Sequence, residues 1–111
     1  MTDVQHRDLA SGRWYELTLA EQLGNVGSEI SRAAKWRDRN PAIARGALER
    51  ALELFDLTLD DARHRQSQAR LRELARVREL VVDFFDGPNE YRSTAKSLQK
   101  YFDQYALAVR P

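Results

Sequence analysis

The sequence predicts an all-α protein, an antiparallel up-down four-helix bundle that forms a single domain over residues 1–111. Apolar residues recur at intervals of three and four along four segments, which is the spacing of one helix face. Short polar breaks separate the segments, and short connections make neighbouring helices antiparallel. Five glycines and three prolines in 111 residues disfavour a turn-rich β architecture.

The first helix is expected from about Trp14 to Arg39, and residues 1–12 are expected to be flexible. Its start is open between a break at Ser11-Gly12 and a cap at Thr18, which forms a capping-box pattern with Glu21. Its apolar face consists of Leu19, Leu23, Val26, Ile30 and Ala33.

Asn40-Pro41 ends the first helix and begins the second, with Asn40 as the N-cap and Pro41 at the first helical position. The second helix is expected to reach Asp60, and residues 60–65 are expected to form a polar connection. Its inner face carries Ala44, Ala47, Leu48, Ala51, Phe55, Thr58 and Leu59.

The third helix is expected from about Ser67, which caps it, to Asp86. Residues 86–89 (Asp-Gly-Pro-Asn) are the clearest turn in the sequence. Ser93 or Thr94 then caps the fourth helix, whose apolar residues continue at heptad spacing to Val109.

Composition excludes most enzyme chemistry. The chain has no cysteine, and its two histidines, His6 and His64, lie far apart in sequence. Phosphate-binding glycine loops, HExxH, GxSxG and the Glu-x-x-His pairs of di-iron bundles are also missing. The sequence therefore predicts a non-enzymatic protein with no cofactor and no metal. Because no apolar run suits a signal peptide or a membrane span, we expect a cytoplasmic protein without membrane contact.

A stripe of small residues runs along the first helix beside its apolar face. Each glycine inside a helix costs about 1 kcal/mol relative to alanine, so a neighbouring helix is expected close to the stripe. That neighbour belongs either to the same chain or to a second copy, and the second alternative predicts a homo-oligomer. Trp36 is either a contact in the same interface or the edge of the core. The predicted oligomer interface consists of Ala20, Gly24, Gly27, Ser31 and Trp36, and Ala34 continues the stripe.

Arginine supplies 15 of the 18 basic residues, and the basic residues gather in two clusters. Guanidinium groups bind phosphates and carboxylates through two parallel hydrogen bonds, so the clusters predict a nucleic-acid or protein partner. The alternative is a solvated surface balanced by acidic residues, which the net charge of +1 favours. The candidate binding residues are Arg32, Lys35, Arg37, Arg39, Arg63, Arg65, Arg70, Arg72 and Arg76.

Arg78 lies within the apolar stripe of the third helix, between Leu74 and Val81. A charge in that position must be paired or must reach an interface. We expect Arg78 to be a buried charge in an ion pair within the chain, for which Glu29 is one candidate partner, and the alternative is an interface or ligand contact.

The pattern of elements resembles a family of small four-helix bundles. The features that carry the resemblance are a first helix that ends in a basic stretch (residues 32–39), an Ala/Leu-rich second helix (residues 47–55) and a small-residue segment (residues 21–30). The family includes proteins encoded by intervening sequences of large-subunit ribosomal RNA and the accessory variability proteins of diversity-generating retroelements. The resemblance implies a non-catalytic, oligomeric bundle that contacts nucleic acid or a reverse transcriptase through its basic faces.

A second helical family is the alternative. HEPN-type proteins are small helical bundles that act as ribonucleases in toxin systems or as partners of nucleotidyltransferases. Their catalytic signature is an arginine followed four to six residues later by a histidine, and neither His6 nor His64 follows an arginine in this way. This alternative therefore predicts a toxin–antitoxin component or a partner subunit without the nuclease motif.

Overall fold

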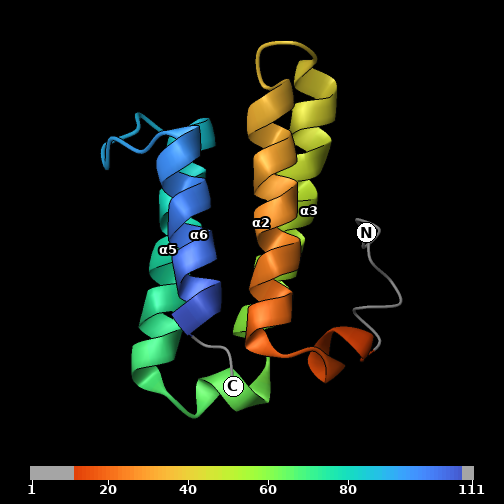
Figure 1. Cartoon of the computed structure of the whole chain (residues 1–111), viewed down its shortest axis with the longest axis vertical. Helices are drawn as coiled ribbons and strands as arrows, with labels where there is room; N and C mark the ends of the chain where they lie inside the picture. The colour runs from red at the N-terminus through yellow and green to blue at the C-terminus, as the bar shows by residue number, and fades with distance from the viewer. Residues whose placement is uncertain (1–11, 109–111) are drawn as a thin grey trace.

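The computed structural model describes residues 12–108, and within them the chain is helical with no strand (Figure 1). The predicted all-α class is confirmed for this part of the chain. Residues 1–11 of the predicted flexible start and Val109 lie outside the described residues. The elements are η1 (Arg13–Glu16, a 3-10 helix), α2 (Leu19–Trp36), α3 (Pro41–Leu59), α4 (Ala62–Arg65), α5 (Gln68–Asp86) and α6 (Ala95–Ala108).

Side-chain caps fix where the first long helix begins. The Glu21 N–H donates to the Thr18 hydroxyl at 3.1 Å, and the Thr18 N–H donates to the Glu21 carboxylate at 2.9 Å. This capping box starts α2 at Leu19, which confirms the Thr18 alternative and rules out a start near Trp14. Residues 13–16 form η1 instead, and α2 ends at Trp36 rather than at Arg39.

The other helix caps lie where the sequence predicts them, and one further helix, α4, has a cap of its own. Asn40 caps α3 with Pro41 in its first turn, and Ser67 caps α5, as predicted. Of the two candidates for α6, Thr94 has the capping contact, because its hydroxyl accepts the Ser97 N–H at 3.0 Å. The expected polar connection contains the short helix α4, which Asp61 caps by accepting the Arg63 N–H at 3.0 Å.

The long helices contact one another in a definite order. α2 packs against α3 and α6, and α3 packs against α5. Contacts between α3 and α5 run in opposite directions along the two helices, since Arg45 pairs with Asp86 and Asp56 pairs with Arg78. The α2–α3 turn and the α5–α6 loop lie toward one end of the molecule, and η1 and α4 lie at the other (Figure 1).

The core is built from the predicted apolar faces together with η1. Trp14 of η1, Val26 of α2, Phe55 of α3 and Val81 of α5 are all completely buried. The rings of Phe55 and Phe102 lie 5.8 Å apart, which joins α6 to the same core. Each such side chain contributes about 1.5–3 kcal/mol by leaving water.

The small-residue stripe of α2 faces α6 of the same chain over part of its length. A Cβ atom added to Gly27 would lie 3.4 Å from the Cβ of Phe102. Gly27 therefore packs against a helix of its own chain, because α6 occupies the space that a second copy would need. No described atom outside its own helical turns lies within 4 Å of a Cβ added to Gly24. For Ala20, Gly24, Ser31 and Trp36, which are half-buried or exposed, an oligomer interface stays a prediction.

The different surroundings of Gly24 and Gly27 predict that substitutions at the two positions change the stability in opposite directions. Gly24→Ala should raise the free energy of unfolding by about 0.5–1 kcal/mol, because it removes backbone freedom from the unfolded chain and meets no neighbour. Gly27→Leu should lower it by about 1–3 kcal/mol, because the larger side chain must displace Phe102. Urea denaturation of both variants measures these changes. Equal effects at the two positions would contradict the different packing of the two glycines.

Candidate functional site

A groove between α2 and α6 brings together basic residues that lie far apart in the sequence. Lys35, in the last turn of α2, and Lys96, in the first turn of α6, both line it. Small side chains such as Ser31, Ala34 and Ala95 lie between them. None of the described residues that line the groove is acidic, and both lysines are exposed. The groove is therefore an electropositive surface without an internal counter-ion.

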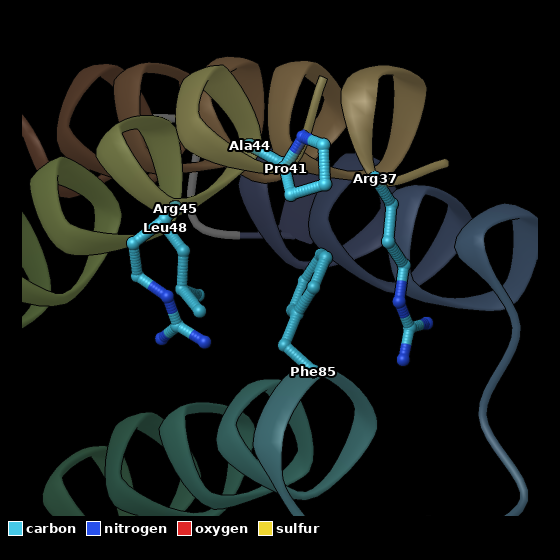
Figure 2. A pocket seen from close by; sticks show the side chains of 6 residues that line it. All are labelled: Arg37, Pro41, Ala44, Arg45, Leu48 and Phe85. Carbon is cyan, nitrogen blue, oxygen red and sulfur yellow. The ribbon is translucent and has the colours of Figure 1, made fainter. Parts of the chain in front are cut away.

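A second depression lies where the beginning of α3 meets the end of α5. Figure 2 shows the Phe85 ring between the side chains of Arg37 and Arg45, with Pro41 on the far side of the ring. Arg45 donates two hydrogen bonds to the carboxylate of Asp86, at 2.6 and 3.0 Å. The hydrogen bond from Arg45 lowers the pKa of Asp86 and outweighs the opposite effect of burial.

Arg37 also serves the fold at this depression. Its guanidinium donates to the carbonyl oxygen of Phe84 at 3.1 Å and lies 4.7 Å from the centre of the Phe84 ring. A cation over an aromatic face contributes about 0.5–2 kcal/mol. Arg37 and Arg45 therefore hold the end of α5 against the α2–α3 turn, and their guanidinium groups are already engaged.

The nine candidate basic residues consequently divide into different classes. Arg63 binds Asp61 and the carbonyl of Leu17, and Arg65 donates to the carbonyl of Leu59 at 3.1 Å. Arg70 is half-buried. The exposed candidates whose side chains form neither an ion pair nor a hydrogen bond within the described part of the chain are Arg32, Lys35, Arg39, Arg72 and Arg76.

The two sequence clusters do not join into one patch. Arg39 lies in the α2–α3 turn, whereas α5, which carries Arg72, begins at the opposite end beside α4 (Figure 1). Lys96 joins Lys35 instead, and sequence inspection missed it because it stands alone rather than in an arginine run. The available signal was its spacing of four residues from Lys100, which puts both lysines on one side of the last helix.

Arg78 forms an ion pair within the chain, as predicted, but its partner is Asp56 and not the candidate Glu29. Arg78 Nε donates to Asp56 Oδ1 at 3.0 Å, and the Asp56 side chain is 62% exposed, so this pair lies at the surface. Glu29 accepts a hydrogen bond from Arg50 at 3.0 Å. The physical reason is the helix order, because α5 packs against α3 and its arginine therefore meets a carboxylate of α3.

A buried polar network, which the sequence analysis did not predict, lies at the other end of the molecule. The Gln22 side-chain amide donates to the carbonyl of Trp14 and to Asp61 Oδ2, each at 3.0 Å. Its oxygen must then act as the acceptor, so the His64 Nε2 at 2.7 Å carries the proton. The Trp14 indole N–H donates to the Thr58 hydroxyl at 3.0 Å. The network joins η1, α2, α3 and α4.

Burial affects the two titratable members of this network differently. Burial alone would raise the pKa of Asp61, but hydrogen bonds from Arg63 and Gln22 outweigh it and hold the pKa below its ordinary value of 3.8. Burial lowers the pKa of His64 below its ordinary value of 6.5, and the nearby Asp61 only partly opposes this. Both side chains are at most 3% exposed, so the hydrogen bonds of the network lie inside the fold and join its elements there.

Comparison with known proteins adds no assignment: no family model, no curated protein and no solved structure matches the chain. Within residues 12–108, no group of three or more histidine, aspartate or glutamate residues has an arrangement that could hold a metal ion. None of the helices described is long and apolar enough to cross a membrane. The resemblance to the four-helix-bundle family stays a prediction.

The network predicts a loss of stability on mild acidification. Folded His64 binds its proton at a lower pH than unfolded His64, so its contribution is complete above pH 6.5 and is lost as the pH falls below this value. Asp61 adds a second loss below pH 3.8 for the same reason. The free energy of unfolding should therefore decrease from pH 7 to pH 5, by at most about 1.4 kcal/mol per pH unit.

Urea denaturation at several pH values measures this slope in the wild type and in His64→Gln. The variant should be nearly flat between pH 7 and pH 5, because glutamine does not titrate. Identical slopes in the two proteins would contradict a buried neutral His64.

Proposed function

We propose that this chain is a non-catalytic, up-down four-helix bundle that binds nucleic acid through a surface at one end of its helices. This surface, which we call the basic end, comprises Arg32, Lys35, Arg39 and Lys96. The observation that carries the proposal is the groove that Lys35 and Lys96 line without an acidic neighbour. Two fixed positive charges on one groove are suited to successive phosphates of a polyanion.

Exposure and the absence of ion pairs among the described residues support the basic end over the rest of the predicted surface. Its four side chains are exposed, and none forms an ion pair with another residue among those described. Arg37 and Arg63, in contrast, already bind groups within the chain. Because the net charge is only +1, the attraction is local and should decrease steeply with salt.

The bundle arrangement is supported by the order of contacts along the helices. Gly27 of α2 lies against Phe102 of α6, and Ser31 and Ala34, further along α2, line a groove with Ala95 at the beginning of α6. The non-catalytic part is supported by the burial of His64, which leaves it 3% exposed as a side chain. The open surface at Gly24 supports an oligomer, and a measurement of the protein's mass in solution tests this.

A salt titration tests nucleic-acid binding. Fluorescence anisotropy with a labelled single-stranded RNA at 20–200 mM salt should show binding that weakens as salt rises. The double variant Lys35→Gln/Lys96→Gln should bind more weakly at low salt. Its plot of log affinity against log salt should be shallower by about 1.4, because each lost phosphate contact contributes about 0.7 on a single strand.

The matched control is Arg72→Gln/Arg76→Gln, which removes the same charge from α5. It should keep the wild-type slope. A larger loss in this control would place the contact on α5 and contradict the basic end. Time-dependent cleavage of the RNA would contradict a non-catalytic protein and favour the HEPN-like alternative, and absence of any nucleic-acid binding at 20 mM salt would contradict the proposal as a whole.

A further inference from the structure

The loop between α5 and α6, residues 87–94, is held in one conformation by side chains that bind its backbone. The Asp83 carboxylate accepts the N–H of Glu90 at 3.0 Å and the N–H of Tyr91 at 3.1 Å. The Asn89 side chain donates to the carbonyl of Ser93 and accepts the N–H of Ser93, both at 2.9 Å. A loop with this many internal hydrogen bonds is preorganised, so little entropy is lost when it binds a partner.

Two residues of this loop have a left-handed backbone, Asn89 with φ of 56° and Arg92 with φ of 53°. Asparagine adopts this region readily, whereas another side chain costs about 1–2 kcal/mol there. Arg92 is exposed, and no hydrogen bond or ion pair of its side chain to the described residues offsets this cost. The loop therefore imposes the backbone conformation of Arg92 without using its side chain.

Tyr91 is one of the few large apolar side chains left at the surface. It is 49% exposed, and the others, Ile43 at 41% and Leu107 at 62%, belong to α3 and to the last turns of α6. The three lie on separate elements, and the loop itself holds no second large apolar side chain. A protein interface has an apolar core built from several such side chains, and Tyr91 is the one that this loop supplies.

Charge around Tyr91 favours a polyanion instead. The carboxylate of Asp83 binds the loop backbone, including the Tyr91 N–H, and Asp86 is paired with Arg45. Of the acidic residues from 83 to 102 this leaves Glu90, against the basic residues Arg92, Lys96 and Lys100. Lys96, in the first turn of the helix that follows the loop, also lines the groove of the basic end. An aromatic ring beside unpaired cations is the arrangement by which proteins bind single strands, with bases on the ring and phosphates on the cations.

We infer that Tyr91 is a stacking platform for an unpaired base of a single-stranded nucleic acid, whose phosphates contact Arg92 and Lys96. This inference rests on the proposed function and adds the class of nucleic acid to it. A duplex keeps its bases stacked on one another, so it offers no face to Tyr91. The chain should therefore bind single strands more tightly than duplexes of the same length.

The test compares Tyr91→Ala with Tyr91→Phe, because phenylalanine keeps the ring and loses only the hydroxyl. Fluorescence anisotropy gives the affinity of each for a labelled single-stranded RNA, and competition with inorganic polyphosphate gives the affinity for a polyanion that has no bases. Tyr91→Ala should weaken binding of the RNA by about 5- to 150-fold, whereas Tyr91→Phe should bind it as the wild type does. Both variants should bind polyphosphate like the wild type.

The other outcomes overturn the inference in distinguishable ways. If Tyr91→Ala binds the RNA normally while Lys35→Gln/Lys96→Gln weakens it, the stacking inference fails and the proposed function stands. If Tyr91→Ala weakens RNA and polyphosphate equally, or Tyr91→Phe is as weak as Tyr91→Ala, Tyr91 acts through something other than stacking. If the wild type binds polyphosphate and RNA equally, or neither of them, base recognition is absent, and in the last case the proposed function fails as well.

Discussion

Asp61 places a carboxylate with 2% exposure at the point where η1, α2, α3 and α4 meet. It caps α4, accepts the amide of Gln22 from α2 and binds the guanidinium of Arg63. Through Gln22 it also fixes the carbonyl of Trp14, whose ring fills one end of the core. A buried charge is tolerated only when all of its partners are in place, so this carboxylate forces several segments into one arrangement. The chain leaves this junction in the direction that lets α5 pack against α3.

Local sequence signals predicted the helices well, because the spacing of apolar residues and the caps at Asn40, Ser67 and Thr94 involve residues a few positions apart. The same reasoning missed the polar network, since Gln22, Asp61 and His64 interrupt no apolar stripe and each looks like an ordinary surface residue. It also gave Arg78 the wrong partner. Which carboxylate an arginine reaches depends on the order in which helices contact one another, and helical periodicity does not contain that order.

The candidate site also could be predicted only in part, because the sequence does not show which basic side chains are bound within the fold. Runs of arginine made residues 32–39 and 63–78 the predicted binding surface. Arg37 and Arg63, however, donate their hydrogen bonds to groups of the same chain. Lys96, a cation of α6 that belongs to neither run, lines the groove, which most members of the runs do not. The density of basic residues along a chain therefore predicts the charge of its surface poorly, because carboxylate and carbonyl groups of the same chain bind some of the basic side chains.

The loop before α6 separates the groups that give it shape from the groups that it displays. Asp83 and Asn89 bind backbone atoms, whereas the side chains of Glu90, Tyr91 and Arg92 form no hydrogen bond with the described residues. Glu90 and Tyr91 can therefore be exchanged while the scaffold beneath them is retained, much as antibody loops vary on a constant framework. The helices would then serve as a constant scaffold, and the binding specificity of the loop could evolve or be engineered one side chain at a time.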